Sequence, residues 1–257
     1  MDGSVAFTVA DHVADLVIDR PAKHNAVTPA MARELARLCG EIESDASVRV
    51  VILRGAGERA FCAGSDLASL AQYKSAWEFR ARVEYSTVVR NLSKPVIAVL
   101  RGWVLGGGLE LALAADIRLA GRSAKLGAPE VKRGWIGAGG ASQFLPRLVG
   151  YGQAMKLLLT GETIDAAEAL RIGLIEELHE DEAVLGRARA MAAQIAGYAP
   201  MAVQSIKAAT RVALSAPLEA GLKYENEMNT LCFTGQDHLE GIKAFYEKRS
   251  PRFTGSD

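Results

Sequence analysis

Cysteine and histidine are scarce in this chain of 257 residues, which has three cysteines and four histidines. The cysteines, Cys39, Cys62 and Cys232, are odd in number and far apart, so we expect no disulfide framework and a reducing compartment. The histidines form no HExxH motif and no paired spacing with cysteine, which argues against a zinc site.

An excess of one charge and a long apolar run are also missing. Lys and Arg number 30 and Asp and Glu number 30, which excludes a chain-wide basic field for nucleic acid. No uninterrupted apolar run approaches the roughly 18 residues that span a bilayer. The first four residues do not resemble a signal peptide, and the last three are not a peroxisomal tripeptide. We therefore expect a cytoplasmic protein without nucleic-acid or membrane partners.

The composition that is present is ordinary for a globular protein, with 49% hydrophobic and 23% charged residues. The length suits one domain, or one domain with a helical appendage. Apolar runs predict strands at 13–18, 48–53, 95–100 and 116–119. Helices are expected at 28–44, with Thr28 as N-cap, and at 76–89 and 108–115. Residues 102–108 read as a glycine-rich turn.

From residue 138 onward the apolar spacing is helical. The expected helices cover 138–149, 151–159, 166–171, 183–196, 201–214, 218–232 and 237–248. Alternating strands and helices followed by helices alone predict an α/β core with a helical C-terminal extension.

Two glycine-containing segments are candidates for binding an anionic or polarised group. Residues 63–67 (AGSDL) could leave the Ser65 N–H directed at a ligand, although the segment alone favours a plain turn capped by Asp66. Residues 106–110 (GGGLE) would open a helix whose N–H groups point at developing negative charge. Alone, this segment favours a tight, closely packed turn, because it matches neither GxGxxG nor a P-loop.

Two glutamates are candidates for acid–base chemistry. Glu110 lies among apolar residues, so it is either a buried acid with a perturbed pKa or a first-turn residue favoured by the helix dipole. Glu130 follows twenty positions later, and alone it reads as a solvated surface residue. Together they would suit proton transfer on a polarised carbonyl compound. A nucleophilic Cys62 or a Ser65 hydrolase is the less favoured alternative, because Cys62 has no histidine nearby and Ser65 is not in a GxSxG motif.

Read together, these segments resemble the crotonase superfamily, the enoyl-CoA hydratase/isomerase family, over essentially the whole chain. The similar segments, in family order, are residues 20–26 (RPAKHNA), 60–67 (AFCAGSDL), 106–110 (GGGLE), 129–134 (PEVKRG), 145–150 (LPRLVG), 158–162 (LLTGE), 169–175 (ALRIGLI) and 240–249 (EGIKAFYEKR). The order of so many motifs is what makes the resemblance specific.

The resemblance implies a spiral of ββα turns at residues 1–195, followed by a C-terminal helical oligomerisation region at 196–257 that mediates trimer formation. Assembly as a homotrimer or a homohexamer, a dimer of trimers, is expected. The implied ligand is a coenzyme A thioester that serves as substrate, with no metal or redox cofactor.

The implied reaction is enoyl-CoA hydration in acyl-CoA and fatty-acid metabolism, including β-oxidation. The backbone N–H groups of Ser65 and Gly107 would bind the thioester oxygen. Glu110 would act chiefly as base toward a water molecule, and Glu130 would protonate C2. The residues implied in coenzyme A binding are Lys23, His24, Ala63, Asp66, Leu67 and Lys248, the last of these reaching a neighbouring subunit's ligand.

The chain departs from the family pattern after Glu130. Gly137 stands where proline is common, and in ungapped register Ala138 replaces a glycine whose N–H helps to place the water. Trp135 is bulky and would either limit the acyl chain or serve packing. Lys23 is shifted by one position relative to many relatives. The alternatives to an enoyl-CoA hydratase are a related hydratase or isomerase acting on a carnitinyl- or aryl-enoyl-CoA, and a non-catalytic protein that binds coenzyme A.

Overall fold

A computed structural model describes residues 3–255 of the chain. Met1, Asp2, Ser256 and Asp257, which entered the prediction about targeting signals, lie outside the described residues. Within the described range, none of the helices is both long enough and apolar enough to cross a membrane. The predicted boundary between residues 195 and 196 falls within the last turn of α8 (Asp181–Ala196) and stays a prediction.

The larger sheet has six strands in the order β1-β2-β3-β5-β7-β10. Its strands are β1 (Ser4–Ala10), β2 (Val13–Asp19), β3 (Val50–Gly55), β5 (Val96–Leu100), β7 (Ile117–Gly121) and β10 (Glu177–His179). Only β1 and β2 pair in antiparallel fashion, and the pairs from β2 through β10 are parallel. The central strands are buried along nearly their whole length, as expected for parallel strands covered on both faces.

The smaller sheet has four short strands in the order β4-β6-β8-β9. They are β4 (Ala60–Cys62), β6 (Trp103–Leu105), β8 (Lys125–Gly127) and β9 (Thr163–Asp165). The chain visits the two sheets alternately, because β3, β5 and β7 join the larger sheet and β4, β6 and β8 the smaller one. The predicted α/β fold of ββα turns with C-terminal helices is therefore confirmed.

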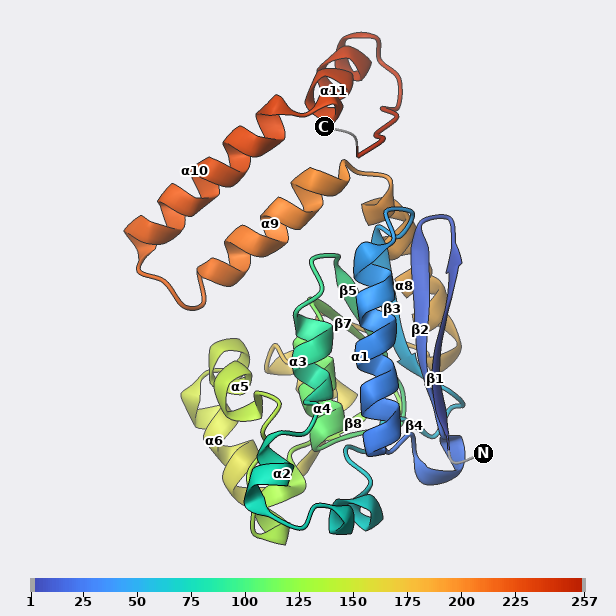
Figure 1. The fold of residues 1–257 in the computed structure, drawn as a ribbon, viewed down its shortest axis with the longest axis vertical. Helices are drawn as coiled ribbons and strands as arrows, with labels where there is room; N and C mark the ends of the chain where they lie inside the picture. Colours follow the sequence, from blue (N-terminus) through green and yellow to red (C-terminus); the bar gives the residue numbers. More distant parts are fainter. Residues whose placement is uncertain (1–2, 256–257) are drawn as a thin grey trace.

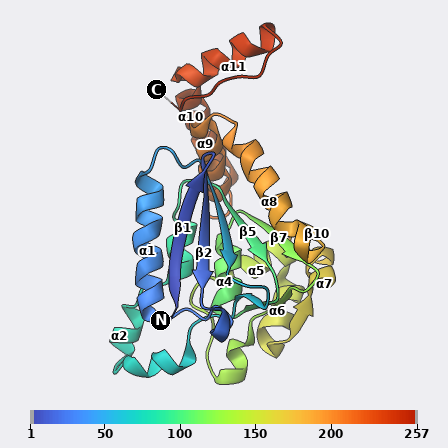
Figure 2. The ribbon, with the colours of Figure 1, turned by 90° about the vertical axis from the view of Figure 1, so that its right-hand side faces the viewer.

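Helices cover both faces of the larger sheet, with α1 (Pro29–Ser44) and α8 on opposite sides (Figures 1 and 2). The other α-helices are α2 (Ala76–Arg80), α3 (Tyr85–Arg90), α4 (Gly107–Ala114), α5 (Ala141–Val149), α6 (Tyr151–Thr160), α7 (Ala166–Arg171), α9 (Pro200–Val212), α10 (Leu218–Thr234) and α11 (Gln236–Tyr246). Short 3-10 helices are η1 (Pro21–Lys23), η2 (Leu67–Gln72) and η3 (Pro129–Arg133).

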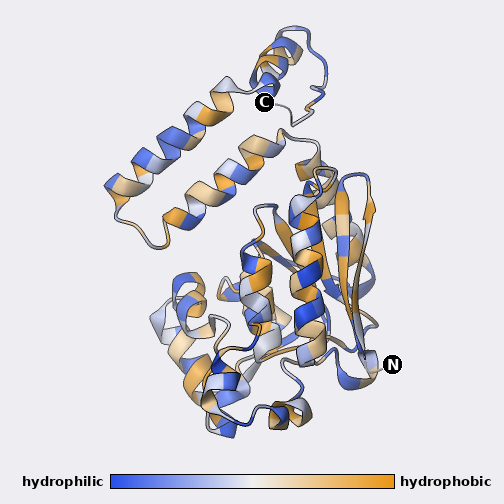
Figure 3. Cartoon of the chain, viewed as in Figure 1, coloured by the Kyte–Doolittle hydropathy of each residue, from blue (hydrophilic) through white to orange (hydrophobic). Residues whose placement is uncertain are grey.

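Helix α1 forms as its sequence predicts. The Thr28 side chain accepts a hydrogen bond from the Met31 N–H at 3.2 Å, and Pro29 occupies the first helical position. Leu35 and Ile42, on the apolar face, are fully buried. Figure 3 shows the same apolar character along the strands of the core.

Three predictions about local structure are wrong. The single helix expected at 76–89 is two helices, because Glu84 adopts an extended backbone conformation (φ −90°, ψ 99°) and starts α3 anew. The turn expected at 102–108 contains β6, and the region expected to be all helical contains β9 and β10. Strands of three residues are too short to show a periodic pattern of burial.

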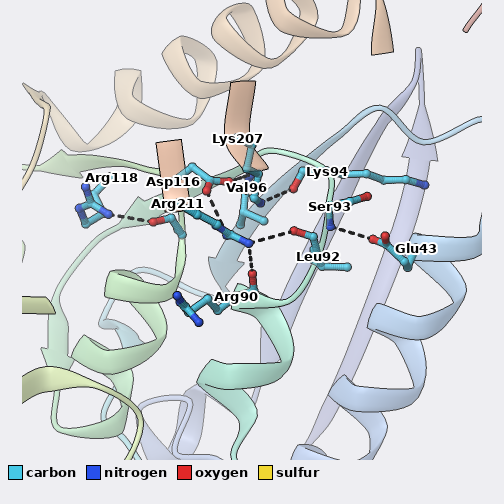
Figure 4. A network of polar contacts seen from close by, with 11 residues as sticks. Glu43, Arg90, Leu92, Ser93, Lys94, Val96, Asp116, Arg118, Lys207 and Arg211 are labelled. Atoms are coloured by element: carbon cyan, nitrogen blue, oxygen red, sulfur yellow. Dashed lines mark hydrogen bonds and ion pairs between the residues drawn. The ribbon is translucent and has the colours of Figure 1, made fainter. Parts of the chain in front are cut away.

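Helices α9 to α11 project from the core (Figure 1), and charged side chains fix their base. Lys207 Nζ of α9 lies 2.6 Å from Asp116 Oδ2, and Arg211 Nη2 lies 3.2 Å from Asp116 Oδ1. Arg211 also donates to the carbonyls of Arg90 and Leu92 at the end of α3 (Figure 4). The projecting helices are therefore tied to the segments that follow α3 and α4.

Candidate active site

The site lies where three neighbouring parallel strands of the smaller sheet end. The segment after β4 contains Ser65, the segment after β6 contains Gly107, and the segment after β8 contains Glu130. Carboxyl ends of parallel strands meet at one edge of a sheet, and ligands bind outside such edges in α/β folds. The topology thus brings together residues that lie far apart in the sequence.

Two backbone N–H groups at this edge are available to a ligand. Among residues 3–255, neither the Ser65 N–H nor the Gly107 N–H has a hydrogen-bond acceptor. Gly64 has φ +93°, and a Cβ added there would lie 3.1 Å from the Gly107 nitrogen, so the two segments lie side by side. Gly107 is the first residue of α4, where the helix dipole adds partial positive charge.

The consecutive glycines allow very close approach of the chain. Gly106 has φ +57°, which favours glycine. A Cβ on Gly107 would lie 1.9 Å from the Tyr85 hydroxyl oxygen, and one on Gly108 would lie 1.9 Å from the Cys62 carbonyl oxygen. The sequence left a closely packed turn and an N–H site as alternatives for residues 106–110. The segment has both features.

Glu110 is a buried acid, so the first of its two predicted readings is the correct one. Its side chain is on α4, and the residue is 4% exposed. Glu110 Oε1 accepts hydrogen bonds from the Gly139 N–H at 2.8 Å and the Ala141 N–H at 3.1 Å. Burial is the main cause that raises the pKa of Glu110 to about 7; the nearby charges of Glu84 and Glu130 contribute to this rise, and the two hydrogen bonds oppose it.

Glu130 is half-buried in η3, so the interpretation as a solvated surface residue is wrong. Its Oε1 lies 3.1 Å from the position that a Cβ on Gly106 would occupy, next to the start of α4. Burial raises the pKa of Glu130 above its ordinary value, while the charge of Arg133 opposes the rise. The pKa values of both carboxyl groups are therefore raised, and both groups lie beside the start of α4, which carries the Gly107 N–H.

One cavity of about 550 Å³ connects these groups. Its lining includes Ser65, Gly107, Glu110 and Glu130. Of the residues implied in coenzyme A binding, Lys23, Ala63, Asp66 and Leu67 line it, whereas His24 and Lys248 do not. The His24 carbonyl instead accepts from the Ala63 N–H at 3.0 Å, and Lys248 is exposed after α11 on the projecting helices.

Asp66 serves as a cap as well as a cavity wall. Its Oδ1 accepts from the N–H groups of Ala68 at 2.9 Å and Ser69 at 3.3 Å, as the simple reading of the turn predicts. Its Oδ2 pairs with the Arg20 guanidinium, which holds the pKa of Asp66 below its ordinary value. Asp66 thus fixes the segment that carries the Ser65 N–H.

The nucleophile alternative finds no support. Cys62 is fully buried, and burial raises the pKa of its thiol to about 12, so it is not poised as a thiolate. The Ser65 hydroxyl pairs with the Tyr85 hydroxyl at 3.2 Å, not with a histidine. In the part of the chain that the structure describes, no group of three or more His, Cys, Asp or Glu residues is arranged to hold a metal ion.

Sequence reasoning assigned no role to the segment between α2 and α3, which forms another wall of the cavity. Arg82 pairs with Glu84 at 3.0 Å and lies 3.9 Å over the Phe79 ring. Ser86 donates to Glu84 Oε1 and to the Gly139 carbonyl, each at 3.2 Å. No local pattern marks this wall in the sequence, because Tyr85 is buried through contacts of α3 with α1 and α4.

The residues that depart from the family pattern also line the cavity. Trp135 is 38% exposed there, and Gly137 and Ala138 lie nearby. A Cβ on Gly137 would lie 2.3 Å from Glu110 Oε1, so it is Gly137 that packs directly against the buried acid. The absence of a side chain at position 137 leaves room for the Glu110 carboxylate.

Known proteins share this chain's sequence and fold. The family described as enoyl-CoA hydratase/isomerase matches residues 8–256. The (E)-benzylidenesuccinyl-CoA hydratase of Thauera aromatica is 37% identical over 254 residues, covering 98% of this chain and 99% of that protein. The short-chain-enoyl-CoA hydratase of Clostridium acetobutylicum is 38% identical over 240 residues, covering 92% of each. A solved enoyl-CoA hydratase structure from Bacillus anthracis has a TM-score of 0.91 at 36% identity and full coverage of both chains.

Proposed function

Because this chain belongs to the enoyl-CoA hydratase/isomerase family and is an enzyme of the enoyl-CoA hydratase class, we propose that Glu110 and Glu130 add water across the C2=C3 bond of its substrate. The substrate is a 2-enoyl-CoA thioester and the product a 3-hydroxyacyl-CoA. The observation that carries the proposal is that both carboxyl groups line the cavity that contains the Ser65 and Gly107 N–H groups. Acid, base and carbonyl-binding groups thus surround one space.

Binding of the thioester oxygen is the first step. The Ser65 and Gly107 N–H groups donate to this oxygen, which becomes enolate-like as electrons leave the double bond. One such donor is typically worth about 10²–10³ in rate, because it is fixed before charge develops. The dipole of α4 acts in the same direction at Gly107.

Proton transfer completes the reaction. The Glu110 carboxylate takes a proton from water while the water oxygen bonds to C3, and Glu130 gives its proton to C2. The sum is the addition of one water, with no change in oxidation state, so the chemistry calls for no redox cofactor. Burial raises the pKa of both acids above their ordinary values, which suits groups that exchange protons with water and with C2.

Coenzyme A lies, in this proposal, along the wall formed by Lys23, Ala63, Asp66 and Leu67. The acyl group then faces the opposite wall, where the segment before α3 and the residues after Glu130 meet. We place Lys248 at the coenzyme of a neighbouring subunit, because it is exposed just after the end of α11.

Homotrimers or homohexamers are the proposed assembly, built through the projecting helices. Apolar side chains there are widely exposed, among them Leu218 (74%), Phe233 (67%), Phe245 (79%) and Tyr246 (79%). Exposed apolar surface of this extent marks an interface. Light scattering of the purified protein tests it: a trimer or hexamer mass is expected, and a monomer at micromolar concentration would contradict it.

A cytoplasmic location and a role in fatty acyl-CoA degradation are also proposed. All three cysteines are free thiols, and two of them, Cys39 and Cys62, are buried, as suits a reducing compartment. The hydration of an enoyl-CoA thioester is the chemistry that such degradation requires.

The reaction is tested by mixing the purified protein with crotonyl-CoA. Loss of the absorbance of the conjugated thioester is expected, together with a product heavier by one water molecule. Binding of the thioester without any loss of absorbance would indicate that the substrate carries another acyl group or that the protein is not catalytic. No binding of any CoA thioester would contradict the proposal.

An aryl-enoyl-CoA is the second candidate substrate. Phe79, Tyr85 and Trp135 all line the cavity, and one relative is named for a benzylidenesuccinyl-CoA. Comparing kcat/KM for cinnamoyl-CoA and crotonyl-CoA in wild type and in Trp135→Ala tests it. A preference for the aryl substrate that is reduced in the variant supports this candidate, and a preference for crotonyl-CoA in both proteins rejects it.

A further inference from the structure

The Tyr85 hydroxyl touches both segments that supply the N–H groups of the oxyanion hole. Its oxygen lies 3.2 Å from Ser65 Oγ. A Cβ added to Gly107 would lie only 1.9 Å from this oxygen, so the hydroxyl group packs directly against the Gly107 backbone. Tyr85 is 5% exposed and lines the catalytic cavity. One hydroxyl group therefore stands at the junction of the two N–H donors.

Its chemical state suits a donor. Burial raises the pKa of Tyr85 above its ordinary value, so the hydroxyl keeps its proton throughout the neutral range. Among the described residues its one hydrogen-bond partner is Ser65 Oγ, and a serine hydroxyl can donate as well as accept. The phenolic proton can therefore turn to a bound ligand while the tyrosine oxygen accepts from Ser65.

The position of the ring is fixed by packing. Tyr85 begins α3, which packs against α1 and α4, and the carbonyls at the far end of α3 accept hydrogen bonds from Arg211 (Figure 4). The neighbouring Ser86 binds the Gly139 carbonyl, whose residue also donates to Glu110. A donor held this firmly needs little reorganisation when charge develops on a ligand.

We propose that Tyr85 is a third hydrogen-bond donor of the oxyanion hole, acting with the Ser65 and Gly107 N–H groups on the thioester oxygen of the bound acyl-CoA. The inference rests on the proposed function, because it takes a CoA thioester as the ligand. It adds a side-chain donor whose strength, unlike that of a backbone N–H, depends on a single residue.

Tyr85→Phe is the direct test, with Tyr151→Phe, at an exposed tyrosine that begins α6, as the matched control. Ser65→Ala removes the other hydroxyl of the pair and tests whether Tyr85 acts through it. A third donor shares the charge with two others, so we expect kcat to fall about 10- to 100-fold in Tyr85→Phe. KM should change little, and Tyr151→Phe should match wild type. The double variant of Ser65 and Tyr85 leaves no unpaired hydroxyl and should be as slow as Tyr85→Phe.

Spectroscopy tests the contact without turnover. Cinnamoyl-CoA is the probe, because polarisation of its carbonyl shifts the absorbance of the conjugated system to longer wavelength. The shift on binding should shrink in Tyr85→Phe and persist in Tyr151→Phe. Difluorotyrosine at position 85 keeps the ring and strengthens the donor, so it should enlarge the shift even if the phenylalanine variant fails to fold.

Several results would overturn the proposal. If Tyr85→Phe leaves both kcat and the absorbance shift of cinnamoyl-CoA unchanged, Tyr85 does not donate to the thioester oxygen. Equal losses in Ser65→Ala and Tyr85→Phe, or recovery in the double variant, would make Tyr85 a positioning residue acting through Ser65. If wild type shifts the probe but hydrates no enoyl-CoA, the proposed function fails while the donor test stands.

Discussion

The buried Glu110 carboxyl group is expected to lower the stability of the folded protein at neutral and alkaline pH. A carboxyl group whose pKa is raised in the folded protein keeps its proton after the unfolded chain has lost it. Stability therefore falls as the pH rises from 4.5, the ordinary pKa, to about 7, the value in the fold. Each pH unit corresponds to about 1.4 kcal/mol, so the loss amounts to about 3 kcal/mol in the free energy of unfolding.

Glu110→Gln should recover this loss. The amide oxygen can accept from the Gly139 and Ala141 N–H groups as Oε1 does, and the amide carries no charge. At about pH 8 the variant should be more stable than wild type by up to about 3 kcal/mol, and the difference should vanish near pH 4.5. The same variant should lose hydratase activity.

Urea unfolding at a series of pH values measures the difference. Protein concentration must be fixed, because assembly adds to apparent stability. Glu58→Gln, an exposed residue on the turn after β3, is the control and should match wild type at every pH. A Glu110→Gln variant that is less stable than wild type at about pH 8, or a difference independent of pH, would refute the reasoning.

Two further perturbations follow from the packing. Gly107→Ala places a Cβ 1.9 Å from a tyrosine oxygen, so it should lower activity at least about 100-fold and cost about 1–3 kcal/mol, measured by turnover and urea unfolding. Gly152→Ala, with open space at its Cβ, should leave both unchanged. Asp116→Ala leaves the buried Lys207 ammonium without its carboxylate and, within the described part of the chain, with only the Lys94 carbonyl as acceptor, so it should cost about 3 kcal/mol in unfolding free energy. A cost below about 0.5 kcal/mol would contradict the role of the ion pair.

The long elements of the fold could be predicted from the sequence, because their signals are local. Thr28 and the apolar spacing that follows it specify α1, and apolar runs mark β2 and β5. The strands β4, β6 and β8 carry the site, yet each has only three residues and shows no period. The resemblance to a family predicted the spiral that residue patterns alone did not.

The sequence indicated individual candidate residues of the site but not their geometry. Ser65 and Gly107 stood out through their glycine neighbours, and Glu110 through its apolar surroundings. Glu130 carried no local sign of burial, because its environment is created by the parallel alignment of β6 with β8. Tyr85 acquires its place by contact between helices, which no spacing in the sequence reveals.

The most direct test of the central claim is the rate of crotonyl-CoA hydration in Glu110→Gln and Glu130→Gln, with Glu58→Gln as control. Both acids line one cavity with the N–H pair, so each variant should lose at least about 100-fold in kcat while still binding the CoA thioester. The control should match wild type. If either glutamine variant keeps wild-type kcat, the two-acid mechanism is wrong.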